Sequence, residues 1–374
     1  MRPGVGLVSQ SSFGCGGSQR SVRTRNAMLR SSAVALATVC CAIGVTAQTQ
    51  QSTEQSSKET VDKDGIFHMP AYQLPLSIYM SEEAKALYRS MDRMMRSPPA
   101  EETFVGEAKA IYPVIIEEGK IASVRTDVVM PKDGAAKENR NRVFVNLHGG
   151  GFHCQHSFQL LEAIPIASAA KIKVISVDYR CAPEYKFPAA SEDVAAVYKE
   201  LLKQYKPQNI GIYGCSAGGI LTAESVAWFQ KEKLPRPGAI GIFCAADGVQ
   251  GGDSRYMAPL LGEEVPPPVP NPPENPAKEY FAGVDVKGPL ISPSLHPEVL
   301  AQFPPTLLIT AMRDFLFSPV VYAHTQLVKA GVDAELHVWD GMMHCFFFSP
   351  DMPESKEMYE VTAKFFEAHL GRLR

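Results

Sequence analysis

Residues 210–219 read IGIYGCSAGG, and this stretch decides the fold of the chain. Its first four residues predict a short buried strand, and residues 217–232 have the composition of a helix. The two meet at Gly214-Cys215-Ser216-Ala217-Gly218, which fits the pattern G-x-S-x-G. The glycines permit a sharp turn that lifts the serine hydroxyl clear of the sheet, and the helix directs backbone N–H groups at the same point. This context predicts that Ser216 is a nucleophile.

Apolar runs and helical stretches alternate on both sides of this turn. Further strands are expected at residues 124–129, 143–147, 173–177, 240–243, 306–310 and 335–338. Further helices are expected after Ser81, through 194–202, and at 320–330 and 354–369. Such apolar strands alternating with helices predict the α/β class, with a mostly parallel central sheet covered by helices on both faces.

Two residues that could activate Ser216 follow late strands of this pattern. Asp314 comes soon after strand 306–310, and His344 comes soon after strand 335–338. In a parallel sheet both lie at the same edge as Ser216, so His344 is the expected base and Asp314 the acid that orients it. Asp340 is a rival acid, four residues before His344. The pairing predicts activity that rises with pH through about 6.5 as an imidazole loses its proton.

A glycine run follows the expected strand 143–147 and reads His148-Gly149-Gly150-Gly151-Phe152. Its exposed N–H groups predict an oxyanion hole made by Gly149, Gly150 and the N–H of Ala217, each donor worth roughly 3–4 kcal/mol. A phosphate-binding loop is the alternative, but neither Lys-Ser/Thr nor G-x-G-x-x-G follows. Phe152 and Phe346 are predicted to bind substrate.

From about Phe104 to Leu370 the chain resembles the hormone-sensitive-lipase-like branch of the α/β-hydrolases. The matching motifs are residues 148–152, 178–184 with 187–189, 214–219, 313–314 and 341–346. The resemblance implies an α/β-hydrolase fold with a helical cap and hydrolysis of carboxylic esters of short to medium acyl chains through an acyl-enzyme. It also supports the triad and the oxyanion donors. Cys215 stands where the family commonly has Asp, which leaves the shape of the acyl pocket open.

Other functions remain open beside the serine esterase. Lactones and small amides suit the same triad, and a non-catalytic binding protein is the more distant alternative. Cys215 is a rival nucleophile, because thiols also attack acyl groups. A metal hydrolase is a further rival, because His148, His153, Cys154 and His156 lie on one loop, although their spacing does not define a zinc site. No cofactor or metal is expected.

The N-terminal residues are expected to lie outside the fold. Residues 1–47 form a signal peptide region, with a basic start, an apolar run and cleavage after Ala47, and Met28 is a second candidate start. A membrane anchor, or a transit peptide on residues 1–30, is the alternative. Residues 48–64 are expected to be a flexible linker, and no stable membrane span is expected after processing. The signal predicts a secreted or periplasmic protein.

The remaining residues, 65–374, are expected to form one hydrolase domain. Its cap would come from about 65–105 and from 251–297, a stretch with seven prolines between Pro266 and Pro276. Five of the eight cysteines lie beyond residue 47, an odd number that excludes a dense disulfide framework and leaves one bridge possible.

Composition limits the partners of this domain. The chain has 374 residues, 45% of them hydrophobic, and a formal charge of −3. The near-neutral charge gives no electrostatic reason for a nucleic-acid partner. The expected triad and the family resemblance imply a small-molecule ester as the partner, and a homodimer is left open.

Overall fold

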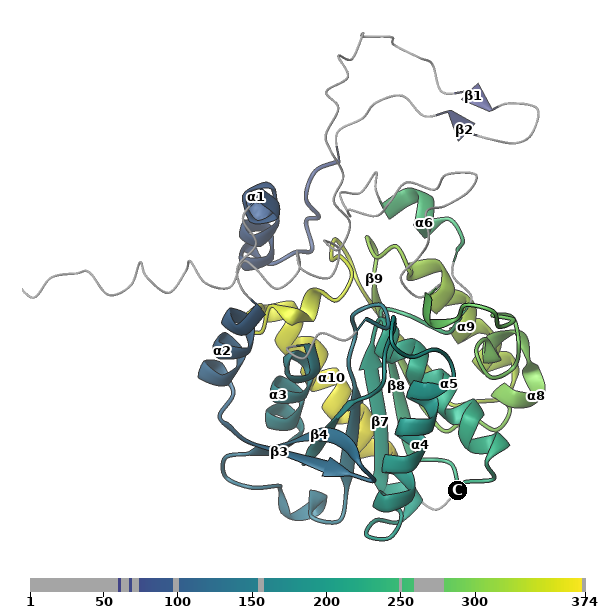
Figure 1. Cartoon of the computed structure of the whole chain (residues 1–374). Coiled ribbons are helices and arrows are strands. Elements are labelled where there is room, and N and C mark those ends of the chain that lie inside the picture. Colours follow the sequence, from purple (N-terminus) through teal and green to yellow (C-terminus); the bar gives the residue numbers. More distant parts are fainter. Residues whose placement is uncertain are drawn as a thin grey trace, which may run out of the picture. The chain divides into compact units, whose positions relative to one another are not determined.

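A computed structural model of the chain describes residues 60–61, 67–68, 74–96, 101–153, 158–248, 251–258 and 279–371 (Figure 1). Its centre is an eight-stranded sheet in the order β10-β9-β8-β7-β5-β6-β4-β3. The strands are β3 Val114–Ile121, β4 Val124–Pro131, β5 Val143–Leu147, β6 Val174–Asp178, β7 Ile210–Cys215, β8 Ala239–Phe243, β9 Thr306–Ala311 and β10 Ala334–Trp339. A separate antiparallel pair joins β1 Thr60–Val61 to β2 Phe67–His68.

Six neighbouring strands, from β10 to β6, run parallel, whereas β4 and β3 pair antiparallel at the other end of the sheet. The predicted α/β class with a mostly parallel sheet is therefore confirmed. Each predicted strand is present within two residues of its expected ends. Strand β3 was not predicted, because its sequence VIIEEGKI carries charges and its residues are mostly exposed at the sheet edge.

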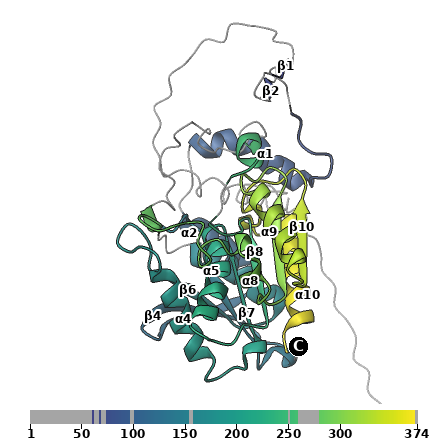
Figure 2. The same ribbon diagram turned by 90° about the vertical axis from the view of Figure 1, so that its right-hand side faces the viewer.

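Helices cover both faces of this sheet. Their bounds are α1 Glu82–Arg96, α2 Glu101–Ile111, α3 Phe158–Ala170, α4 Ala189–Leu201, α5 Ala217–Lys231, α6 Ser254–Met257, α8 Pro297–Leu300, α9 Phe317–Lys329 and α10 Pro353–His369. Short 3-10 turns are η2 Lys137–Asn139, η3 Pro207–Asn209, η5 Pro293–Leu295 and η6 Phe346–Phe348. Residues of α3 and α10 belong to one hydrophobic cluster, and those of α4, α5 and α9 belong to a second. The two helix layers, seen on either side of the sheet in Figures 1 and 2, bury the strands on both faces.

Helix α3 was missed by the sequence analysis for a physical reason. Its sequence FQLLEAIPIASAA is apolar around its whole circumference and contains Pro165. A helix buried on all sides shows no amphipathic period, so its pattern does not reveal it.

Helix α1 is the first part of the expected cap. The backbone N–H of Ala84 donates a 3.0 Å hydrogen bond to Ser81 Oγ, so Ser81 caps the helix as predicted. Ser81 Oγ donates in turn to Glu354 at the start of α10, at 2.8 Å, which fastens the two helix starts together. This N-terminal segment is therefore attached to the body of the domain by polar contacts.

The described part of the second expected cap segment, residues 251–297, contains the short elements α6 and η5, the start of α8 and two helical residues at 279–280. The prolines from 266 to 276 lie outside the described residues, as do the predicted signal region 1–47 and all of 48–64 except 60–61. Within the residues that the structure describes, no helix has the length and apolar character needed to cross a bilayer.

Candidate active site

The turn at Ser216 joins the end of β7 to the start of α5. Ser216 has φ 55° and ψ −121°, a conformation that side-chain-bearing residues rarely adopt. The turn is tight because its backbone lies against β5: a Cβ built on Gly218 would lie 1.7 Å from the carbonyl oxygen of Leu147. Glycine is therefore required at 218, and the strained turn holds the Ser216 side chain at the carboxyl end of the sheet.

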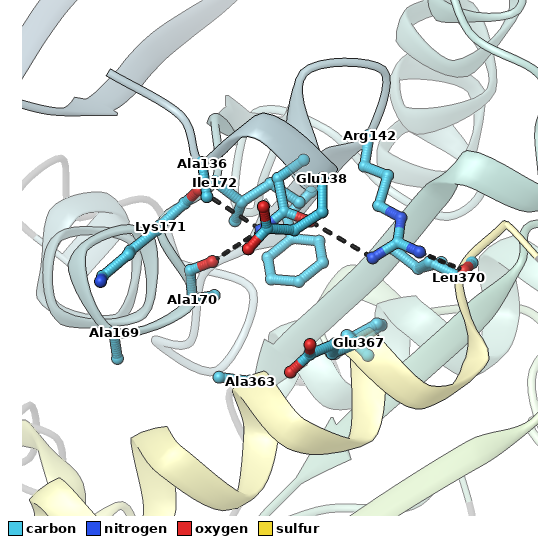
Figure 3. Close-up of a pocket in the computed structure, with 13 residues that line it drawn as sticks. Ala136, Glu138, Arg142, Ala169, Ala170, Lys171, Ile172, Ala363, Glu367 and Leu370 are labelled. Carbon is cyan, nitrogen blue, oxygen red and sulfur yellow. Dashed lines mark hydrogen bonds between the residues drawn. The ribbon is translucent and has the colours of Figure 1, made fainter. Parts of the chain in front are cut away.

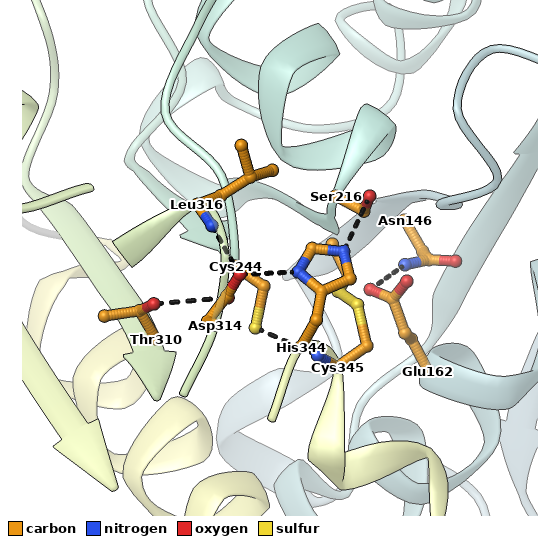
Figure 4. The surroundings of a disulfide bond; sticks show 10 residues. Asn146, Glu162, Ser216, Cys244, Thr310, Asp314, Leu316, His344 and Cys345 are labelled. Atoms are coloured by element: carbon orange, nitrogen blue, oxygen red, sulfur yellow. Dashed lines mark hydrogen bonds and ion pairs between the residues drawn. A yellow bond between two sulfur atoms is a disulfide. The ribbon is translucent and has the colours of Figure 1, made fainter. Parts of the chain in front are cut away.

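The structure brings Ser216, His344 and Asp314 together from three parts of the sequence (Figure 4). His344 Nε2 lies 3.0 Å from Ser216 Oγ, and His344 Nδ1 lies 2.9 Å from Asp314 Oδ1. The Asp314 side chain is fully buried, and Ser216 and His344 are 8% and 3% exposed. One imidazole thus connects the hydroxyl to the carboxylate, which is the geometry in which a histidine removes the serine proton.

The Asp314 carboxylate is held by two further donors. The backbone N–H of Leu316 donates to Oδ1 at 2.8 Å, and Thr310 Oγ1 donates to Oδ2 at 3.3 Å. The rival acid, Asp340, is exposed and accepts a hydrogen bond from Ser77. The structure therefore places Asp314, and not Asp340, beside His344.

The predicted oxyanion donors lie next to the serine. A Cβ built on Gly149 would lie 3.5 Å from Ser216 Cβ, so the glycine loop passes directly beside the nucleophile. Gly150 has φ 109°, in the region that favours glycine. Ala217 is the first residue of α5, where a backbone N–H has no acceptor within the helix. The glycine loop and the start of α5 therefore both adjoin Ser216.

The aromatic residues predicted to bind substrate are both wholly buried and belong to different clusters. Phe152 stacks on Tyr280, with ring centroids 4.5 Å apart. Phe346 lies in η6 and contacts Trp339, with centroids 5.3 Å apart. Both side chains pack in the interior, where they support the glycine loop and the histidine loop respectively.

The loop with candidate metal ligands is described only in part, because Cys154 and His156 lie outside the described residues. The ring of His148 is buried and stacks on Tyr179, with centroids 4.3 Å apart. His153 Nε2 instead lies 3.9 Å from a carboxylate oxygen of Glu279. The two described histidines thus face different neighbours.

The sequence analysis missed a disulfide at the centre of the site. Cys215 and Cys345 are joined, and the thiol of Cys244 lies in the same cluster. Cys215 is therefore not a thiolate nucleophile, and that alternative is wrong. The signal was present in the sequence, since the two cysteines directly flank Ser216 and His344, but spacing alone does not reveal that they meet.

A second missed residue is Glu162, a lone carboxyl group on the apolar helix α3. It is wholly buried, and Asn146 Nδ2 donates to it at 3.2 Å. Burial raises the pKa of Glu162 to about 8, although the contacts with Asn146 and with the backbone of Cys215 act in the opposite direction. Glu162 therefore holds a proton at neutral pH, and Figure 4 shows its side chain beside Asn146.

A hollow far from this site is shown in Figure 3. Its lining includes Phe144 at the start of β5, Ile172 just before β6 and Leu370 just after α10. The amino ends of the parallel strands therefore form it, opposite the triad. Arg142, also in the lining, donates to the carbonyl oxygen of Leu370 at 2.8 Å, which ties the end of the chain to the sheet.

Comparisons with known proteins agree with this fold. The family model described as alpha/beta hydrolase fold matches residues 144–348. The chain is 29% identical over 239 residues to an acetyl-hydrolase of Streptomyces hygroscopicus, across 62% of this chain and 77% of that protein. Its structure is similar to that of esterase E25, with a TM-score of 0.69 and 30% identity over 81% of this chain and 98% of that one.

A second solved structure is an esterase from the bacterial hormone-sensitive lipase family. It aligns with a TM-score of 0.65 and 26% identity, over 78% of this chain and 99% of that one. The chain therefore belongs to the α/β-hydrolase family. The resemblance to its hormone-sensitive-lipase-like branch is confirmed.

Proposed function

We propose that this protein, a carboxylic ester hydrolase, cleaves esters of short to medium acyl chains with Ser216, His344 and Asp314. The observation that carries the proposal is the continuous chain of contacts Ser216–His344–Asp314, in which both links are 3.0 Å or shorter. The strained turn under Ser216 and the adjacent glycine loop support it, because such a turn presents a serine hydroxyl to a substrate and glycine N–H groups can stabilise the oxyanion of acyl transfer.

The first half of the reaction makes an acyl-enzyme. Ser216 Oγ attacks the ester carbonyl carbon while His344 Nε2 accepts the hydroxyl proton, and the Asp314 carboxylate stabilises the imidazolium that forms. The negative carbonyl oxygen is stabilised by the N–H groups of Gly149, Gly150 and Ala217. The tetrahedral intermediate then collapses: the C–O bond to the alcohol breaks, and His344 gives its proton to the leaving oxygen.

The second half regenerates the enzyme. Water attacks the acyl carbon while His344 accepts one of its protons, and a second oxyanion forms in the same place. The bond between the acyl carbon and Ser216 Oγ breaks, and Ser216 recovers its proton from His344. The products are one carboxylic acid and one alcohol, and the cycle uses no redox step.

The acyl range follows from the family resemblance and from the relatives' names, one of which is an acetyl-hydrolase. A panel of p-nitrophenyl esters with two to twelve acyl carbons, together with simple lactones, tests it. The expected result is a maximum of kcat/KM at short to medium chains. A preference for long chains, or for lactones over every linear ester, would overturn this part of the proposal.

Labelling with a fluorophosphonate tests the nucleophile directly. We expect one adduct on Ser216, no adduct on Ser216→Ala, and a loss of turnover of about three orders of magnitude or more in that variant. Ser225→Ala, a buried serine further along α5, is the matched control and should keep both labelling and turnover. A well-folded Ser216→Ala protein with wild-type turnover would exclude the mechanism.

We also propose that residues 1–47 direct export, that 48–64 link the signal to the domain, and that about 65–105 and 251–297 cap the site. The support for export is the sequence pattern together with a disulfide, a bond that persists in oxidising compartments. N-terminal sequencing of the protein recovered outside the cytoplasm should begin at residue 48. Recovery of the uncut chain in the cytoplasm would refute export.

A further inference from the structure

The Cys215–Cys345 disulfide directly flanks the two residues between which the proton moves. Cys215 precedes Ser216, Cys345 follows His344, and the bond closes a separation of 130 residues. Both cysteines are buried, with exposures of 0% and 1%. Figure 4 shows this buried bond next to the His344 side chain.

The two loops joined by this bond are otherwise far apart along the sheet. The serine turn follows β7 and the histidine loop follows β10, and β8 and β9 lie between those strands. The hydrogen bond from Ser216 to His344 is a second direct link between the two loops. Without the disulfide, the distance between Oγ and Nε2 would depend on non-covalent contacts of the two loops, such as the hydrogen bond from the Met343 N–H to Tyr88.

The backbone on both sides of the bond is also constrained. Ser216 and Cys345 have φ values of 55° and 51°, which side-chain-bearing residues adopt only when the surroundings hold them there. The backbone N–H of Cys345 donates to the sulfur of Cys244 at 3.4 Å. A covalent link between the two turns is a direct means of holding both conformations at once.

We propose that the Cys215–Cys345 disulfide is a positioning element for catalysis, and that the enzyme is fully active only when this bond is formed. The inference deepens the proposed function, because it rests on His344 acting as the base for Ser216. It assigns the cysteines no contact with substrate. Their effect is to keep His344 Nε2 within hydrogen-bond distance of Ser216 Oγ.

The same bond makes the activity sensitive to dithiol reductants. One thiolate of the reductant attacks a cysteine sulfur, the S–S bond breaks, and a mixed disulfide forms. The second thiol of the reductant resolves it, so the reductant becomes a cyclic disulfide while Cys215 and Cys345 gain two electrons and two protons as thiols. Once the loops are released, kcat is expected to fall.

The bond itself is tested by mass spectrometry of a proteolytic digest of the unreduced protein, with thiols alkylated beforehand. The expected product is a linked pair of peptides that contain Cys215 and Cys345, with Cys244 alkylated. A link that uses Cys244, three alkylated thiols, or a thiophilic metal held by the three sulfurs would each overturn the assignment.

The positioning role is tested with Cys215→Ala, Cys345→Ala and the double variant, because Cys181 is disulfide-bonded too and a reductant alone does not separate the two bonds. We expect each variant to lose about tenfold in kcat with KM within about twofold, since misplacement of a base affects the chemical step. The double variant should equal either single variant, because each already lacks the bond. Cys244→Ser, which removes the third thiol of the cluster and keeps an acceptor for the Cys345 N–H, should keep the linked peptides and kcat within about twofold.

Two outcomes would refute the role. A lower Tm with unchanged kcat at 25 °C would show that the bond only stabilises the fold, and losses that multiply in the double variant would show that the cysteines act separately. These outcomes differ from a failure of the proposed function itself. If Ser216 is not the nucleophile, Ser216→Ala would keep its turnover, and the linked peptides would still be found.

Discussion

The phenol oxygen of Tyr88, on helix α1, accepts a 2.6 Å hydrogen bond from the backbone N–H of Met343, the residue before His344. Two further contacts join the same N-terminal segment to the catalytic loops. Ser77 Oγ donates to Asp340, and Arg313 donates to the carbonyl oxygen of Pro75 at 3.1 Å. The first segment of the proposed cap is thus attached to the loops that carry His344 and Asp314.

Tyr88→Phe is expected to weaken both stability and turnover. Tyr88 is only 8% exposed, so the change leaves the Met343 N–H buried without its acceptor, at a cost of about 1–3 kcal/mol. Because the lost contact adjoins His344, kcat should fall by roughly two- to tenfold. Thermal unfolding and ester turnover measure the two effects. Tyr79→Phe, at a residue that is 79% exposed, should change neither, and equal effects from both variants would contradict the argument.

Asp314→Asn and Asp340→Asn form a matched pair that separates the two candidate acids. The first removes the charge beside His344 Nδ1 and should reduce kcat by about 10³- to 10⁴-fold. The second alters an exposed side chain that contacts Ser77, and its kcat should stay within about threefold of wild type. Steady-state kinetics with one short-chain ester provide the comparison. The reverse ranking would assign the orienting role to Asp340.

Glu162→Gln is expected to alter how stability depends on pH. The pKa of Glu162 is raised to about 8 from an ordinary value of 4.5, so between these values the folded state holds a proton that the unfolded state has lost. Stability therefore falls as pH rises through this window, by up to about 1.4 kcal/mol per pH unit. Because the amide side chain of the variant cannot ionise, the part of the pH-dependent loss of stability that comes from Glu162 should be absent. Denaturant unfolding from pH 5 to 8 measures it, and parallel curves for both proteins would disprove the raised pKa.

Gly218→Ala and Gly106→Ala should act in opposite directions. A Cβ on Gly218 collides with the Leu147 carbonyl, so the variant should lose about 3 kcal/mol or more of unfolding free energy. Gly106 lies within helix α2 with no atom within 4 Å of the added Cβ, so alanine there should gain about 0.5–1 kcal/mol. Chemical denaturation gives both values. A stable, fully active Gly218→Ala protein would contradict the expected collision between the added Cβ and the Leu147 carbonyl oxygen.

Much of the fold was accessible from sequence, because most of the strands are buried apolar runs and several helices begin at local signals. Ser81 illustrates this, since an N-cap acts on residues only three positions away. Strand β3 and helix α3 were missed for the opposite reason: one is exposed and charged, and the other is apolar on all sides, so neither has the period that marks its type.

The sequence by itself predicted the family and the proposed catalytic residues Ser216 and His344, with Asp314 favoured over Asp340 as the acid, because each of these groups lies in a short motif near the end of a strand. Only the tertiary structure showed that Asp314 rather than Asp340 reaches His344, that Cys215 bonds to Cys345, and that Tyr88 supports the histidine loop. The physical reason is distance along the chain. These contacts join residues 30, 130 and 255 positions apart, and such pairs meet only where strand order and loop packing bring them together.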